Sequence, residues 1–230
     1  HLHLKPVFVE PDKTTLLMDP LQIEKVITSK TKAIIPVHLY GKCCDMDSIN
    51  QIAQHYQLKV LTDAAQAHGA SYKGQPVGSL ADAEAFSFYP TKNLGAIGDA
   101  GAIVTQDESL AIQLRALRNY GFTQKNIVDY TGINSRLDAI QAAVLSEKLP
   151  YLPIHNLRRQ EIATHYLNGI IQPAVQLPDK TTVQEDAWHL FVIRHPERDR
   201  LQHYLHHKGI GTQIHYPLPP YRQTIFQHTD

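Results

Sequence analysis

One lysine of this chain, Lys92, lies in a setting unlike that of an ordinary surface lysine. It sits in the segment FSFYPTKNLG at positions 86–95, where an apolar run ends in a tight loop bracketed by aromatic residues and glycines. Glycine lets the backbone approach a ligand closely, whereas a lysine amine in water is usually protonated and unreactive. The segment is therefore consistent with a solvated turn lysine or with an amine that serves a bound ligand.

A carboxylate with a comparable setting is Asp63, in the segment TDAAQAHGA at positions 62–70. It directly follows the apolar run 58–62. An open α/β sheet binds its ligands outside the carboxyl ends of its strands, which is where such an aspartate would lie. A carboxylate buried there is costly unless it meets a cation or strong donors. The alternative is that Asp63 caps a turn before small residues.

A third polar segment, GINSRLDAIQAA at positions 132–143, enters a predicted helix. Asn134 or Ser135 could cap that helix. The free N–H groups at a helix start also bind phosphate well, so this segment too has a structural and a ligand-binding interpretation.

These residues must be positioned by regular elements, and apolar runs alternate with helical periodicity along the chain. Strands are predicted at 32–37, 58–62, 85–88 and 101–105, and helices at 45–56, 107–118, 137–149 and 153–170. The helix at 45–56 begins with an acidic cap at Asp45, and the order of strands and helices indicates an α/β sheet.

The pattern changes near Gln172. Beyond it we predict a strand at 188–194, a helix at 197–207 and a strand at 211–216, which would form a smaller C-terminal α/β domain. We therefore divide the chain into residues 1–150, part of a large ligand-binding domain, and residues 151–230, a linking helix and a truncated small domain. The run 6–10 is typical of a strand in mid-fold, and both ends look cut, so we expect a fragment of a longer protein.

Composition disfavours several classes of function. Twenty-two basic side chains balance twenty-two acidic ones, so no long-range field draws the protein to nucleic acid or anionic lipid. No run approaches the roughly 20 apolar residues that span a bilayer. The two cysteines, Cys43 and Cys44, are adjacent and match no zinc motif. We expect a cytoplasmic protein without a metal, a membrane or a nucleic-acid partner.

Taken together, the segments resemble the DegT/DnrJ/EryC1/StrS family of sugar aminotransferases. The matching motifs are PVHLYG at 36–41, DAAQAHG at 63–69, SFYPTKNLG at 87–95, NSRLD at 134–138 and HYP at 215–217. Their order and spacing agree over nearly the whole chain, so the combination is far more specific than any one motif.

The resemblance implies a fold-type I enzyme, with a mostly parallel sheet flanked by helices, that uses pyridoxal 5′-phosphate (PLP). Lys92 matches the family's Schiff-base lysine, and Asp63 matches the acid that pairs with the pyridine nitrogen. Gln66 matches a glutamine beside the cofactor ring, and Ser87 matches a phosphate-binding serine.

The resemblance also implies partners. Asn134 matches an asparagine that reaches the cofactor phosphate of the neighbouring subunit, which implies a homodimer with shared sites. His215 and Tyr216 match a motif near the substrate. The expected substrates are an amino acid donor, glutamate by resemblance, and a nucleotide-linked keto sugar.

Three alternatives remain. Dehydratases of the same family carry histidine in place of the lysine, so Lys92 favours amino transfer. The family's N-terminal segment, which helps to bind the cofactor, appears absent here, and this favours a non-catalytic remnant; the intact Asp63, Gln66, Ser87 and Lys92 oppose that alternative. A nucleotide-binding protein without PLP is disfavoured because neither GxGxxG nor GxxxxGK[ST] occurs.

Overall fold

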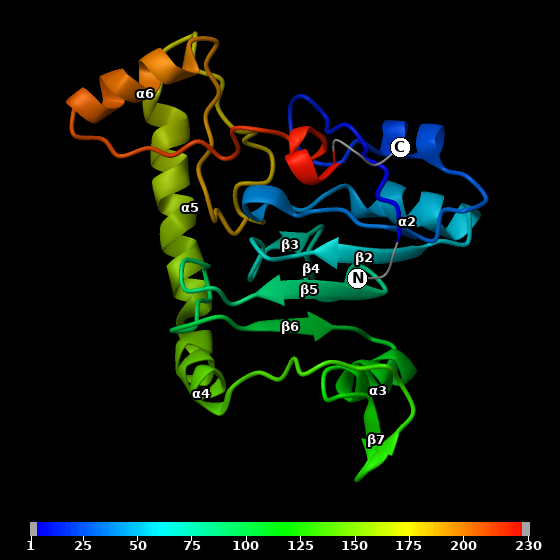
Figure 1. The fold of residues 1–230 in the computed structure, drawn as a ribbon. Coiled ribbons are helices and arrows are strands. Elements are labelled where there is room, and N and C mark those ends of the chain that lie inside the picture. Colours follow the sequence, from blue (N-terminus) through cyan, green and yellow to red (C-terminus); the bar gives the residue numbers. More distant parts are fainter. Residues whose placement is uncertain (1–3, 227–230) are drawn as a thin grey trace.

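The computed structural model describes residues 4–226 of the 230, and its centre is a four-stranded sheet (Figure 1). The strands follow the order β1-β2-β5-β6, in which β1, β2 and β5 are parallel and β6 is antiparallel to β5. This confirms the predicted mostly parallel sheet. The strands are β1 (Ala33–Ile34), β2 (Lys59–Asp63), β5 (Ala83–Ser87) and β6 (Gly101–Val104).

The remaining elements connect and flank this sheet. Two small hairpins, β3 (Ser71–Tyr72) with β4 (Gln75–Pro76) and β7 (Phe122–Gln124) with β8 (Ile127–Val128), lie outside it. The helices are α1 (Pro20–Ile23), η1 (Glu24–Val26), η2 (Leu39–Gly41), α2 (Met46–His55), α3 (Glu108–Leu117), α4 (Ala139–Lys148), η3 (Leu149–Tyr151), α5 (Leu152–Gly169), α6 (Arg198–His207), η4 (Pro220–Arg222) and η5 (Thr224–Phe226).

Helix α2 covers one face of the sheet. Asp45 caps it as predicted, because its carboxylate accepts a hydrogen bond from the backbone N–H of Ser48. The apolar side of α2, with Ile49 and Ala53, packs in one cluster with Ile34 of β1 and Val60 of β2. This cluster is the largest apolar core of the described chain, and it holds the strands in register.

The opposite face of the sheet carries apolar side chains that this chain does not bury. Ile35 is 57% exposed, Leu61 is 40% exposed and Ile103 is 53% exposed. Side chains alternate between the faces of a strand. Leu61 therefore shares a face with Asp63, while Val60 and Thr62 point toward α2.

Helix α5 stands across the carboxyl ends of β2 and β5, and α4 continues below it (Figure 1). Its buried residue Asn156 donates a hydrogen bond to the backbone carbonyl of His68, just beyond β2. The helix thereby fixes the loop that follows Asp63. Among residues 4–226, no helix is both long enough and apolar enough to cross a membrane.

Three of the predicted strands are wrong. Residues 6–10, 188–194 and 211–216 form no strand, and the nearest feature is an isolated bridge between Gln176 and Arg194. A strand needs a neighbour that satisfies its backbone groups. The segment 188–194 instead bonds to the loop at Tyr40, which accepts from the N–H of Leu190. The helix predicted at 197–207 is confirmed as α6.

Candidate active site

The site forms where β2 and β5 end. In the sheet register Asp63 lies opposite Ala85, so Ser87 lies two residues further along the neighbouring strand. Neighbouring strands are about 4.8 Å apart and two residues rise about 6.6 Å, which puts the Cα atoms of Asp63 and Ser87 about 8 Å apart. Both residues, with Ile35, Leu61 and Ala65, line one hollow.

Two backbone hydrogen bonds hold Asp63 against the segment that follows β1. Its N–H donates to the carbonyl of Pro36, and its carbonyl accepts from the N–H of His38. Its Oδ1 accepts from the N–H of Ala65 at 2.9 Å. The turn-cap interpretation is therefore correct for one carboxylate oxygen, while the carboxylate also faces the hollow.

Lys92 lies in a turn closed by a hydrogen bond from its own N–H to the carbonyl of Tyr89 at 2.9 Å. The turn is so tight that a Cβ built on Gly95 would lie 2.4 Å from the carbonyl oxygen of Pro90. Glycine is thus required there by the backbone of Pro90, whereas the sequence suggested a close approach to a ligand. The side chain of Lys92 is partly buried.

The charge of Lys92 helps to lower the pKa of two histidines, His189 and His68. Burial, followed by the charge of Lys92, lowers the pKa of His189 to about 4. Burial also lowers the pKa of His68 to about 4. A hydrogen bond to the Ser87 backbone opposes this shift, and the charge of Lys92 adds to it. The His68 ring is 3% exposed and lies beside Phe86 and Phe88 at centroid distances of 5.4 and 5.6 Å. Neither histidine was singled out as a site residue from the sequence, because nothing local marks them.

Gln66 links the loop after Asp63 to the C-terminal segment. Its Oε1 accepts from the N–H of Tyr40 at 2.6 Å, and its Nε2 donates to the hydroxyl of Tyr216 at 3.1 Å. The Tyr40 hydroxyl donates to the carbonyl of His215 at 2.6 Å. His215 and Tyr216, about 150 residues away in sequence, are thereby brought to the same site.

Asn134 is not brought to this hollow. It is exposed, forms an isolated bridge with Asn119 and accepts a hydrogen bond from Nε of Arg136 at 3.2 Å. Helix α4 is capped by Asp138, whose carboxylate accepts from the N–H of Ala139. The prediction that Asn134 or Ser135 caps this helix is therefore wrong, since the helix begins four residues later.

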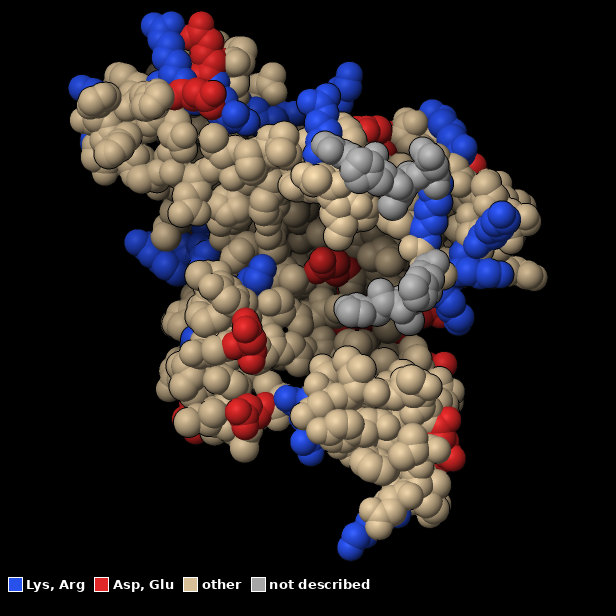
Figure 2. Space-filling model, in the orientation of Figure 1, with Lys and Arg blue, Asp and Glu red and all other residues tan. Residues whose placement is uncertain are grey.

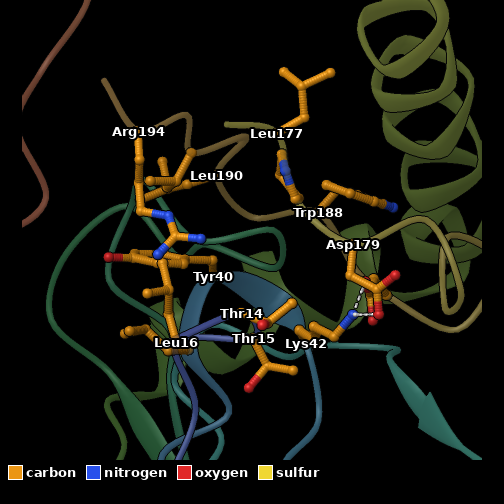
Figure 3. A pocket seen from close by; sticks show the side chains of 14 residues that line it. Thr14, Thr15, Leu16, Tyr40, Lys42, Leu177, Asp179, Trp188, Leu190 and Arg194 are labelled. Carbon is orange, nitrogen blue, oxygen red and sulfur yellow. Dashed lines mark ion pairs between the residues drawn. The ribbon is translucent and has the colours of Figure 1, made fainter. Parts of the chain in front are cut away.

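A second, narrow pocket is lined by Tyr40, Lys42 and Trp188, among other residues (Figure 3). In it Nζ of Lys42 donates to Thr182 at 2.6 Å and lies 3.6 Å from Asp179 and 3.8 Å from Asp186. Burial raises the pKa of Asp186 to about 6, and the charge of Lys42 opposes that rise. This cluster fastens the segment 179–186 to the loop at Tyr40. Within residues 4–226, no group of His, Cys, Asp or Glu side chains is arranged to hold a metal ion.

Comparison with known proteins gives consistent results. The model of the DegT/DnrJ/EryC1/StrS aminotransferase family matches residues 1–230. A relative, the dTDP-3-amino-3,6-dideoxy-alpha-D-galactopyranose transaminase of Aneurinibacillus thermoaerophilus, is 57% identical over 221 residues, which are 96% of this chain and 61% of that protein.

Solved structures of similar proteins have the same fold as this chain. DesV of S. venezuelae superimposes with a TM-score of 0.92 at 46% identity, covering 96% of this chain and 60% of that one. NtdA of Bacillus subtilis, solved with bound cofactor PMP, superimposes with a TM-score of 0.87 at 37% identity, covering 95% and 51%. The chain thus spans less than two thirds of the length of each of these relatives.

Proposed function

The chain belongs to the DegT/DnrJ/EryC1/StrS aminotransferase family, and from this we propose that its protein is a PLP-dependent enzyme that moves an amino group from an amino acid to a nucleotide-linked keto sugar. The observation that carries the proposal is that Asp63 and Ser87 line one hollow where β2 and β5 end, and that the turn containing Lys92 follows Ser87 closely along the chain. Enzymes of this family depend on PLP, and the NtdA structure contains its aminated form.

The residues at this edge fit the three polar ends of PLP. A carboxylate at Asp63 suits the pyridine nitrogen, an amine at Lys92 suits the aldehyde, and the hydroxyl of Ser87 suits the phosphate. The hollow is also lined by the apolar residues Ile35, Leu61 and Ala65, which suit the face of an aromatic ring.

When bound, PLP supplies the electron sink of the reaction. The negative charge of Asp63 favours a protonated pyridine nitrogen, because an opposite charge nearby stabilises the charged form. Gln66, which Tyr40 and Tyr216 hold by hydrogen bonds, would lie beside the ring of the bound cofactor. The amine of Lys92, once displaced by the donor, takes the proton that leaves the donor's α-carbon and delivers it again, as general base and acid.

Amino transfer is favoured over dehydration because Lys92 is present and because the relative with 57% identity is named a transaminase. That name supports a dTDP-linked 3-keto-6-deoxyhexose as the first sugar to test. Glutamate is the proposed amino donor.

A homodimer with shared sites is the proposed assembly. Asn134 is exposed, and near it the β7–β8 hairpin exposes Ile127 (48%) and Val128 (56%), while Ile133 is 67% exposed. Figure 2 shows a largely uncharged surface over α3 and β7. A second copy that covers this surface would bring Asn134 toward its partner's cofactor phosphate. Both cysteines are free, which suits a reducing cytoplasm.

The direct test combines colour and labelling. The purified protein with added PLP should absorb in the visible range, and borohydride should attach the cofactor to Lys92, as peptide mass analysis would show. Lys92→Met should abolish the label, whereas Lys30→Met, in an exposed turn before β1, should keep it. Incubation with glutamate and dTDP- or UDP-linked keto sugars should then give an amino sugar. Label on another lysine, or a sugar that loses a hydroxyl, would refute the proposal.

A further inference from the structure

The side chain of Asn93, next to Lys92, joins three segments of the chain. Its Nδ2 donates to the Oδ1 of Asn156 in α5 at 3.0 Å and to the carbonyl of Ala187 at 2.7 Å. Its Oδ1 lies 3.1 Å from Nδ1 of His189. The lysine loop, helix α5 and the segment 187–189 are therefore tied together at one amide.

The orientation of this amide follows from two backbone carbonyls. A carbonyl oxygen can only accept, so the Asn93 atom that faces Ala187 must be the nitrogen. The same reasoning applies to Asn156, whose Nδ2 donates to the carbonyl of His68 at 2.7 Å and whose Oδ1 must therefore face Asn93. Both hydrogens of the Asn93 amide are then used, and its oxygen faces His189.

This orientation fixes the tautomer of His189. An amide oxygen has no proton to give, so Nδ1 of His189 must carry the hydrogen of their bond. In a neutral imidazole the other nitrogen, Nε2, is then an acceptor with a free lone pair. His189 is neutral near pH 7, because burial and the charges of Lys92 and Arg159 lower its pKa to about 4; the other titratable groups that face it are His68 and His215.

The backbone of His189 is also held in place. The guanidinium of Arg159 in α5 donates to the carbonyls of Trp188 and His189 at 3.1 and 3.3 Å. The segment is fastened to the loop at Gly41, whose carbonyl accepts from the N–H of Ala187. A ring with both its backbone and its Nδ1 secured has little freedom to turn its Nε2 elsewhere.

We propose that His189 is a positioning residue of the active site, whose unprotonated Nε2 accepts a hydrogen bond from the amine of Lys92 once the amino donor has displaced that amine from the cofactor. The catalytic consequence rests on the proposed function, in which the freed lysine must stay beside the reacting carbon. A lysine has four rotatable bonds and would otherwise move away. His68 also lies near Lys92, but its ring is enclosed by Phe86 and Phe88, and no residue selects its tautomer.

The tautomer of His189 and its nearness to the charge of Lys92 are tested without the cofactor. In the PLP-free protein with ¹⁵N-labelled histidine, His189 should show the Nδ1–H tautomer at pH 7 and titrate well below the usual 6.5. Lys92→Met should shift the Nε2 resonance and raise the pKa of His189, because a cation that opposes imidazolium formation is removed. Lys30→Met, in an exposed turn before β1, should do neither. An Nε2–H tautomer, or a His189 signal indifferent to Lys92→Met, would overturn the proposal.

The positioning role of His189 is tested by replacing it with each of two amide side chains, Gln and Asn. In His189→Gln the side-chain oxygen can reach the place of Nε2, whereas in His189→Asn the amide can replace only Nδ1. We expect kcat of His189→Asn to fall about 10²-fold, since a misplacement of about 1 Å can cost that much, with KM little changed. His189→Gln should recover most of the loss. Equal losses in both variants would show that Nε2 has no positioning role. An unaltered protein without transaminase activity would refute the proposed function while leaving the spectroscopic result intact.

Discussion

The two faces of the central sheet serve different purposes. The face toward α2 is closed, with Val60 3% exposed and Thr62 2% exposed. The other face leaves Leu61 40% exposed and ends in Asp63 and Ser87. Because side chains alternate along a strand, one five-residue strand, β2, contributes to both.

The closed face also contains a polar network. Glu84 is 1% exposed and accepts from the N–H of Leu80 at 2.5 Å and from the hydroxyl of Thr62 at 2.9 Å. Nε2 of His38 lies 3.9 Å from the same carboxylate. The buried hydrogen bonds of Glu84 tie β2 and β5 together at one register, while Nε2 of His38 has no hydrogen-bond partner. The open face keeps its carboxylate available for a ligand. We therefore expect changes on the closed face to affect folding and changes on the open face to affect chemistry.

The largest effect on activity is expected for Asp63→Asn. The amide can still accept from the N–H of Ala65, so the folded structure should be retained, but the negative charge that faces the pyridine nitrogen is lost. We expect kcat for sugar transamination to fall at least about 10²-fold, as when a preorganised charge is removed from an active site. The melting temperature should change little. Asp99→Asn, at an exposed position in the loop before β6, is the control. Parental activity in Asp63→Asn would contradict the assignment.

The reverse pattern is expected for Glu84→Ala on the closed face. The change leaves the N–H of Leu80 and the hydroxyl of Thr62 without their acceptor in a buried site. We expect a loss of about 3 kcal/mol in the free energy of unfolding, because each buried unsatisfied donor costs about 1–3 kcal/mol. Urea unfolding measures it, with Glu147→Ala on the exposed side of α4 as the control. The remaining folded protein should keep its kcat; a folded but inactive variant would mean that the faces are not independent.

The sequence predicted this division only in part. The strands β2 and β5 and the helix cap at Asp45 were predicted correctly, because each depends on residues adjacent in the chain. The strands at 188–194 and 211–216 were not formed, because a strand depends on a partner that no local pattern specifies. The roles of Asp63 and Ser87 toward a cofactor come from the family resemblance and stay a prediction; the structure shows that both residues line one hollow.

His189 shows the limit of sequence reasoning most clearly. It is one histidine among fourteen, in a run that was interpreted as a strand. Its importance comes from Asn93 and Lys92, nearly 100 residues earlier, which reach it only through the fold. No spacing rule connects them, so three-dimensional contact was needed to find it.

The closed face should also make stability depend on pH. Burial lowers the pKa of His38 from 6.5 to about 4, so the unfolded chain binds a proton there more readily than the folded one. Stability from this group is therefore complete above pH 6.5 and is lost as the pH falls toward 4. Between pH 7 and pH 5 the loss should be about 2 kcal/mol. His38→Asn, whose amide oxygen can still accept from the N–H of Cys44, should reduce this loss, and His206→Asn, exposed on α6, should not. An unchanged slope in His38→Asn would place the pH dependence elsewhere.

The smallest effect, and the most direct comparison of the faces, is expected from neighbours on β2. Val60→Ala removes buried methyl groups and should lower the free energy of unfolding by about 2 kcal/mol, whereas Leu61→Ala should cost under about 1 kcal/mol because its side chain is already partly in water. Denaturant unfolding of both variants measures the difference. The chain spans 61% of the length of its relative, so the whole protein supplies a further comparison. Leu61→Ala in the whole protein could lower the free energy of unfolding as much as Val60→Ala does. That result would mean that residues outside this chain cover the open face, which is exposed only in the 230 residues taken alone.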